Sequence, residues 1–353
     1  MLGFASRTWD GWDYVPHAWP VWLEADDGVL LVGCAGRPGD GSTALDRDGQ
    51  PLELGRPLAV ARVATLSESE AWLEGIRVDP RVRGMDVATD LQVDELRWAA
   101  AQGARVVRYA TSDRNEGSHR LGARHGFKLL TSLRTYWWNE DAEDEDETGF
   151  SEEVRLAASA QRRELLELLG SAGMVVTHGD GARWWARISA EEAFRAGARL
   201  YEHRAWALQE LTQQAFSAHL GRGEVLAEEN DGGSWALAIL EREALPAEDV
   251  SLHLSLLAGQ GWQATLRLVS AVQRLCDGPI RFRLVDVPGA PGVDAEAFAA
   301  AGFVKREWRL DILGRPLGGS ARSMVRSLQL ALPVVPLAIG GHAGGQLRPP
   351  CTA

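Results

Sequence analysis

The segment Glu74–Ala88 constrains the fold of this chain most, because it reads as a strand, a basic turn and the start of a helix. Apolar residues suit a strand up to Val78, and Pro80 ends it. From Val87 to Trp98 the apolar residues recur at helical spacing, so we expect a helix to begin just after Gly84. This order of elements indicates an α/β protein.

The turn in this segment is a candidate site for a diphosphate group. Backbone N–H groups at a helix N-terminus lack partners within the helix, and the helix dipole is positive there. Gly84 lets the backbone approach a ligand, while Arg81 and Arg83 add positive charge. The alternative is an ordinary strand-to-helix connection with solvated arginines.

The elements that follow carry a resemblance to a known family. A second strand is expected at Arg105–Thr111, followed by Asn115, a short helix, the pair Gly126-Phe127 and another strand. Together with the run Arg77-Val78-Asp79-Pro80-Arg81-Val82-Arg83-Gly84, this order resembles the GNAT superfamily of acyl-CoA-dependent N-acyltransferases. The resemblance covers residues 58–138.

The resemblance implies an acyl-CoA site, with acetyl-CoA as the cosubstrate. In that family, backbone amides of the turn bind the pyrophosphate of coenzyme A. Asn115 is expected to bond the pantetheine arm, and its alternative role is a helix N-cap. The cofactor-binding residues that the resemblance implies are Ile76, Val78, Arg81, Arg83, Gly84, Met85, Asp86, Val87, Ala88 and Asn115.

Asp86 departs from the family motif, which has Gly or Ala at this position. Two interpretations are open. An inward carboxylate would repel the diphosphate by about 1–4 kcal/mol, which weakens binding tenfold or more. An outward carboxylate would instead favour the helix dipole and cap free N–H groups.

Two residues are candidates for the proton transfers. Glu74 is expected to share a mostly apolar strand face with Ile76 and Val78, which suits a general base; the alternative is a surface glutamate. The tyrosine that the family commonly uses as general acid aligns with Gly122, so it is absent. His119, one helical turn earlier, is the candidate substitute, and its alternative is a solvated helix histidine.

An acidic run at residues 140–147 divides the chain, because it has no apolar residue larger than Ala and repels itself. The order of elements repeats after it, and Gly302-Phe303 echoes Gly126-Phe127. We therefore predict an α/β (α+β) fold of two tandem GNAT-like domains, each a mixed, mostly antiparallel sheet flanked by helices. The predicted parts are a domain with the acyl-CoA loop at 1–139, a linker at 140–150, a degenerate domain at 151–315 and a tail at 316–353.

The second half is expected to be structural. Its strands are predicted at 223–228, 234–241, 250–257, 280–285 and 308–312. Its helices are predicted at 162–169, at 295–301 and, after the segment 259–262, over about a dozen residues that end near Leu275. A further strand is expected to start at 154–156. Its turn Gly259–Ala264 has no arginine and is not expected to bind coenzyme A. The first half lacks the family's usual first strand, and the tail segment 333–339 is a candidate to supply it.

Charge and composition exclude several classes. A net charge of −12 argues against nucleic-acid binding, which needs a basic surface. No run of about 18 uncharged apolar residues and no signal peptide appears, so we expect a cytoplasmic protein without a membrane segment. The three cysteines are scattered, and no metal site is expected. The expected partner is a small-molecule or peptide amine, and a homodimer stays open.

The leading hypothesis is an N-acyltransferase that moves an acetyl group from acetyl-CoA to an amine, with Glu74 assisting deprotonation. The alternative is a non-catalytic GNAT-like module that binds acyl-CoA weakly or binds a protein partner. A dinucleotide-binding fold is excluded because no Gly-x-Gly-x-x-Gly follows the first strand.

Overall fold

Two units make up the structure, a computed structural model that describes residues 3–4, 13–36, 43–138, 167–168, 170–204, 206–229, 232–240, 252–275, 280–288, 294–318 and 334–337. Unit 1 comprises Met1–Tyr109, Gly117–Lys128 and Gly314–Ala353, and unit 2 comprises Ala110–Glu116 and Leu129–Leu313. The acidic run, the predicted strand start at 154–156 and most of the predicted helix at 162–169 lie outside the described residues. No helix among the described residues is long and apolar enough to cross a membrane.

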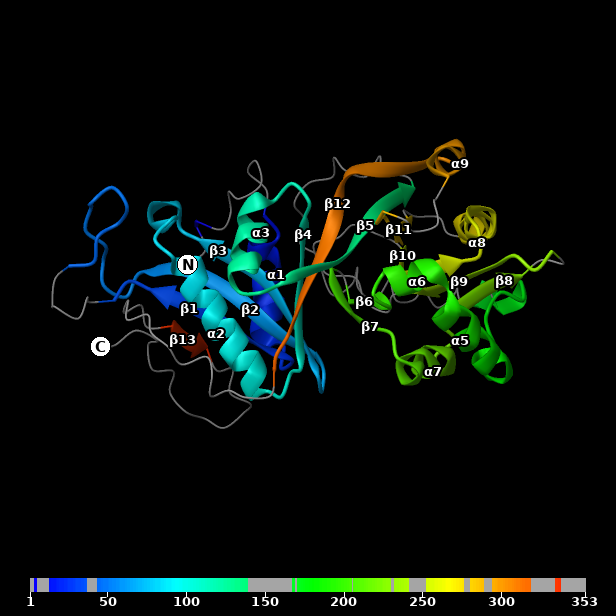
Figure 1. The fold of residues 1–353 in the computed structure, drawn as a ribbon, viewed down its shortest axis with the longest axis horizontal. Helices are drawn as coiled ribbons and strands as arrows, with labels where there is room; N and C mark the ends of the chain where they lie inside the picture. The colour runs from blue at the N-terminus through cyan, green and yellow to red at the C-terminus, as the bar shows by residue number, and fades with distance from the viewer. Residues whose placement is uncertain are drawn as a thin grey trace. The chain divides into compact units, whose positions relative to one another are not determined.

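Unit 1 is a mixed sheet with helices on both faces. Its strands lie in the order β13-β1-β2-β3-β4, and only β3 and β4 pair in parallel. Figure 1 shows α2 in front of this sheet and α1 behind it. The elements are α1 (Val15–Glu24), β1 (Gly28–Cys34), β2 (Pro57–Ser67), β3 (Glu70–Val78), the 3-10 turn η1 (Pro80–Val82), α2 (Val87–Ala101), β4 (Val106–Ser112), α3 (Glu116–Arg124) and β13 (Val334–Leu337).

The tail supplies the outer strand of unit 1. β13 pairs antiparallel with β1, from Leu30 opposite Leu337 to Gly33 opposite Val334. This confirms the prediction for the tail segment at 333–339. Its physical basis is that β1 would otherwise present a row of unpaired backbone groups at the edge of the sheet.

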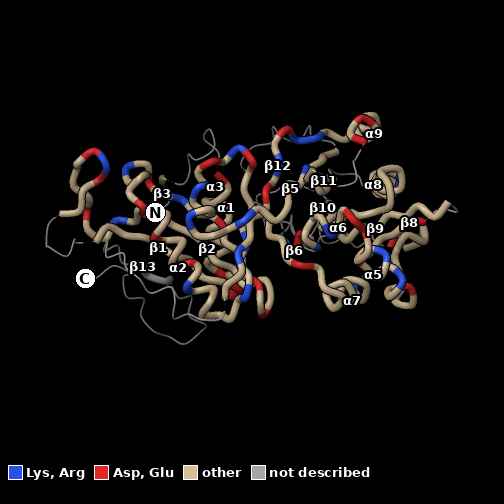
Figure 2. The backbone as a smooth tube through the Cα atoms, in the orientation of Figure 1, with Lys and Arg blue, Asp and Glu red and all other residues tan. Residues whose placement is uncertain are grey.

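Unit 2 contains six strands of the main sheet, which has eleven strands among the described residues, and a separate two-stranded hairpin. Its main strands lie in the order β12-β5-β11-β10-β9-β8, and β6 pairs with β7. Charged positions of both signs occur in each unit (Figure 2). The elements are β5 (Lys128–Trp138), the 3-10 turn η3 (His178–Asp180), α5 (Gly181–Ala190), α6 (Glu192–Ala196), β6 (Leu200–Arg204), β7 (Ala207–Glu210), α7 (Gln213–Gly221), β8 (Val225–Glu229), β9 (Trp235–Leu240), β10 (Leu252–Gly259), α8 (Trp262–Leu275), β11 (Ile280–Val285), α9 (Ala295–Ala300) and β12 (Phe303–Pro316).

The order of elements confirms the predicted tandem fold. The series β8-β9-β10-α8-β11-α9-β12 repeats β1-β2-β3-α2-β4-α3-β5, and β10 pairs with β11 in parallel as β3 does with β4. β5, the last strand of the first series, pairs antiparallel with β11 in unit 2, from Leu133 opposite Val285 to Trp138 opposite Ile280. The sequence did not predict α5, α6, β6, β7 or α7.

Aromatic side chains fill the core of unit 2 beneath α8 and α9. Tyr136 stacks on Phe282 with ring centroids 5.3 Å apart, and Phe298 and Phe303 pack edgewise or tilted against the same ring of Phe282. Phe282 and Phe298 are completely buried. Such a cluster buries a large apolar area, so unit 2 has a core to which both halves of the chain contribute.

Candidate active site

A β-bulge distorts β3 in the middle of unit 1. Arg77 lies opposite Val60 and Glu74 opposite Arg62, so β3 advances three residues where β2 advances two. The bulge contains Gly75, which has a φ of 69°. A Cβ there would lie 2.6 Å from the indole of Trp22, so only glycine fits both the backbone and the space.

The bulge overturns one expectation about Glu74. Val60 and Arg62 lie two residues apart on β2 and therefore share a face, so their partners Arg77 and Glu74 share a face as well. The prediction that Glu74 shares its face with Ile76 and Val78 is wrong, because the extra residue breaks the two-residue alternation.

Glu74 is held by a buried arginine. Its Oε1 accepts a hydrogen bond from Nη1 of Arg62, and Oδ1 of Asp27 accepts one from Nη2 of the same guanidinium. The side chains of Arg62 and Glu74 are 2% and 8% exposed, and Arg62 lies 5.6 Å from the ring centroid of Trp22. Glu74 is thus oriented by charge-assisted hydrogen bonding on the α1 side of the sheet.

A second polar cluster lies beside Glu74, and the sequence analysis missed it. Nε and Nη2 of Arg77 donate to the carboxylate of Asp13 at 2.5 and 2.8 Å, and the Arg77 guanidinium lies 5.3 Å from the ring centroid of Tyr14. Burial raises the pKa of the Tyr14 hydroxyl to about 12, although Arg77 acts in the opposite direction. Tyr14 therefore keeps its proton at neutral pH. The sequence signal was the polar pair Asp13-Tyr14 directly before a helix.

The turn after β3 is built by Asp79. Its carboxylate accepts hydrogen bonds from the Arg81 backbone N–H at 3.0 Å and from Nη2 of Arg81 at 2.7 Å. These bonds with Arg81 lower the pKa of Asp79, against the opposing effect of its burial. Nε of Arg83 donates to the carbonyl of Val78 at 3.2 Å. Arg81 and Arg83, which the sequence analysis assigned to the turn, therefore also form hydrogen bonds at the end of β3.

Gly84 and Asp86 bring the chain into α2 with left-handed backbone conformations. Their φ angles are 83° and 59°. The Asp86 side chain makes no cap hydrogen bond to α2; its Oδ1 accepts one from Nη1 of Arg124 on α3 at 3.0 Å. Asp86 and Arg124 are 61% and 63% exposed. Asp86 is thus exposed and paired with Arg124, and it does not make the helix cap that the second interpretation included; the inward and outward interpretations both stay predictions.

The predicted cofactor residues from Ile76 to Ala88 form one continuous segment of unit 1. Met85 is exposed, whereas Val87 is buried under the first turn of α2. Asn115 belongs to unit 2, and its backbone N–H donates to the carbonyl of Ser112 at 2.9 Å. His119 lies on α3, partly buried. The roles of Asn115 and His119 stay predictions.

The structure gives a reason for the missing family tyrosine. The hydroxyl of Tyr109 donates to the carbonyl of Ser118 at 3.0 Å and lies against Gly122. A Cβ on Gly122 would be 2.0 Å from that hydroxyl oxygen. Tyr109 from β4 therefore fills the place that a side chain on α3 would need, so residue 122 cannot be a tyrosine here.

Comparison with known proteins found one family model that matches part of the chain. Residues 7–127 match the model of the Acetyltransferase (GNAT) family. No curated protein matches the chain.

Solved structures similar to the chain include a GCN5-related N-acetyltransferase from Sphaerobacter thermophilus, at 13% identity over 74% of this chain and 78% of that one, with a TM-score of 0.42. A tandem GNAT protein from the clavulanic acid biosynthesis pathway has 10% identity over 76% and 82% of the two chains, with a TM-score of 0.38. A structure of yncA from Salmonella typhimurium with its cofactor acetyl-CoA has 18% identity over 23% and 49%, with a TM-score of 0.22.

The family model covers α1, β1 to β3, the turn, α2, β4 and α3, so it includes every residue that the sequence assigned to the acyl-CoA site. The identified likeness is therefore that residues 7–127 of this chain match the GNAT acetyltransferase family model.

Proposed function

We propose that this protein transfers an acetyl group from acetyl-CoA to an amine. The observation that carries the proposal is the turn from Asp79 to Val87 within the matched family domain. Gly84 has the left-handed backbone conformation that leads into α2, and the Asp86 carboxylate accepts a hydrogen bond from Arg124. The N-terminal N–H groups of a fifteen-residue helix would then bind the pyrophosphate of coenzyme A.

In the proposed reaction the amine nitrogen attacks the thioester carbonyl carbon, the carbon–sulfur bond breaks, and the thiolate leaves and takes up a proton. Glu74 would accept the proton that the amine loses, directly or through water, with Arg62 fixing its carboxylate. His119 is the candidate proton donor to the thiolate. Positioning of the two substrates supplies a large part of the rate in such a transfer.

Calorimetric titration of acetyl-CoA into the full chain tests whether the turn from Asp79 to Val87 binds this cosubstrate. The wild-type protein is expected to bind with micromolar affinity, and Asp86→Gly is expected to bind at least as well, because Arg124 pairs with the Asp86 carboxylate and offsets its charge. Gly84→Asp should weaken binding, since it adds a side chain and a negative charge at the close approach. If wild type does not bind but Asp86→Gly does, the aspartate blocks the turn and the non-catalytic alternative is favoured.

Release of free coenzyme A thiol, measured in a screen of small amines and peptides, then tests the transfer. Glu74→Gln should lower kcat with little change in the affinity for acetyl-CoA, because it removes a base and leaves the turn intact. The matched control is Glu68→Gln, an exposed glutamate in the turn before β3. Equal rates for wild type and Glu74→Gln would remove Glu74 from the mechanism.

A further inference from the structure

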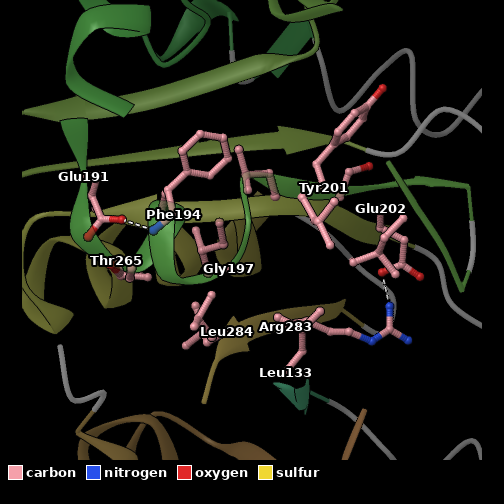
Figure 3. Close-up of a pocket in the computed structure, with 18 of the residues that line it drawn as sticks. Leu133, Glu191, Phe194, Gly197, Tyr201, Glu202, Thr265, Arg283 and Leu284 are labelled. Carbon is pink, nitrogen blue, oxygen red and sulfur yellow. Dashed lines mark hydrogen bonds and ion pairs between the residues drawn. The ribbon is translucent and has the colours of Figure 1, made fainter. Parts of the chain in front are cut away.

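Unit 2 contains a pocket that the proposed acetyl transfer does not use. β10 and β11 pair in parallel only from Leu252 opposite Ile280 to Leu254 opposite Phe282. Beyond this point both strands line a cavity of about 90 Å³ (Figure 3). Residues of β5, α6, β6, β7, α8 and α9 also line it.

The body of this pocket is apolar and small. At about 15 Å³ for each water-sized group, the volume holds about six heavy atoms. Glu191 also lines the pocket, but its carboxylate accepts the backbone N–H of Phe194 at the start of α6. The buried apolar residues of the wall include Phe194, Leu200, Leu208, Leu256, Leu284 and Phe298.

Arg283 supplies hydrogen-bond donors at one end of the pocket. Its side chain is 4% exposed, and Nη1 donates to Oε2 of Glu202. Nε and Nη2 are also buried, and among the described residues they have no hydrogen-bond partner. Figure 3 shows the Arg283 guanidinium below Glu202, at the end of the view away from Glu191 and Thr265. Nε and Nη2 are the pair of donors that matches the two oxygens of a carboxylate.

The charges around Arg283 favour an anion. Glu202 is also 2.6 Å from Nε2 of His253 and 3.8 Å from Nη2 of Arg281, so the carboxylate that pairs with Arg283 also lies near a second guanidinium. Burial lowers the pKa of Arg283 to about 9, which leaves it protonated at neutral pH. A buried cation that lacks full compensation is costly, and a bound monoanion would balance it.

The turn that precedes α8 argues against coenzyme A as the occupant. A Cβ on Gly259 would lie 2.6 Å from the carbonyl oxygen of Trp235, so the chain passes tightly against β9. The backbone N–H of Gln260 already donates to that carbonyl at 2.9 Å. The turn has no arginine, and Trp262 begins the helix.

We propose that the pocket of unit 2 binds a short-chain monocarboxylate of about four carbons, with its carboxylate on Nε and Nη2 of Arg283 and its alkyl chain among the leucine and phenylalanine side chains. This site goes beyond the proposed acetyl transfer and does not depend on it.

Calorimetric titration of sodium butyrate into the full chain at pH 7 tests the site, with butyramide as the neutral probe of the same size. Saturable binding of butyrate and none of butyramide is expected. Arg283→Gln should weaken butyrate binding about tenfold or more, because the charge-assisted bonds are lost. Leu208→Phe should abolish binding by filling the cavity. The matched control Arg267→Gln changes a partly exposed arginine of α8 that is paired with Glu228, and should bind as wild type does.

The outcomes separate this proposal from the proposed function. Leu208→Phe should still bind acetyl-CoA as wild type does, and a failure of acetyl-CoA binding would leave the butyrate result standing. Leu208→Phe keeps the test valid if Arg283→Gln does not fold. The proposal is overturned if wild type shows no saturable butyrate binding, which would mean that water satisfies the guanidinium. Equal affinity for butyramide, or unchanged affinity in Leu208→Phe, would overturn it as well.

Discussion

Replacing Glu95 on α2 by methionine is expected to stabilise the protein at neutral pH. The Glu95 side chain is 1% exposed, and among the described residues neither carboxylate oxygen has a hydrogen-bond partner. Burial raises the pKa of Glu95 well above its ordinary value. A buried polar group without a partner costs about 1–3 kcal/mol, and methionine has a similar length without that cost. The expected gain is therefore about 1–3 kcal/mol of unfolding free energy.

The gain should depend on pH in a defined direction. Because the pKa of Glu95 is raised in the folded state, the unfolded chain loses this proton at a lower pH than the folded chain does. The stability of the wild type is thus greatest below the ordinary pKa of glutamate and falls as the pH rises from there towards the folded pKa. The difference between Glu95→Met and wild type should be smaller near that ordinary pKa, where only the cost of the buried neutral carboxyl remains, and larger at neutral pH.

Urea unfolding followed by circular dichroism at several pH values measures this difference. Glu95→Gln should remove the pH dependence but regain less stability, because its amide is still a buried polar group. The control is Glu68→Met, at an exposed position where no such gain is expected. A Glu95→Met variant that is less stable than wild type at neutral pH, or a gain that does not change with pH, would refute the reasoning.

Three further predictions follow from unit 1. Gly75→Ala should lower the unfolding free energy, measured in thermal melts, by about 2 kcal/mol or more, because backbone strain and the clash with Trp22 add. The control Gly49→Ala, at a position with a similar φ and open space, should lower it by about 1–2 kcal/mol. Equal losses in the two variants would contradict this. Gly122→Ala should be strongly destabilising alone but much less so with Tyr109→Phe, which removes the blocking hydroxyl; additive losses in the double-mutant cycle would count against it. Asp79→Asn should lower the unfolding free energy at neutral pH and approach the stability of the wild type as the pH falls, because the pKa of Asp79 is lowered in the folded state. A difference in unfolding free energy between the two proteins that stays constant across pH would show that the ion pair with Arg81 contributes nothing.

Local sequence patterns were sufficient to predict most of the helices and strands whose order repeats between the two halves of the chain. Helical spacing located α2 and α8, and short apolar runs bounded by turns located β8, β9 and β11. The missing first strand pointed to the tail, and β13 confirmed it. The helical spacing and the short apolar runs are local signals, and the prediction for the tail follows from the need of an edge strand for a partner.

Other features could not be read from the sequence because they depend on contacts between distant residues. The face of Glu74 changes with one extra residue at Gly75, and that glycine is explained by Trp22 on α1. Tyr109 excludes a side chain at Gly122 only once β4 and α3 pack together. Arg283 and Glu202 are 81 residues apart in sequence, so their pairing in the pocket had no local signal.

The return of the chain to unit 1 has a consequence for its synthesis. Gly314–Ala353 belong to unit 1, where Nη1 of Arg315 donates to the carbonyl of His125 at 2.6 Å and β13 covers the edge of β1. A ribosome that has released only the first 140 residues has therefore not yet made these contacts. The nascent first half carries an open sheet edge until the last segment emerges, and during that interval the edge can pair with another chain.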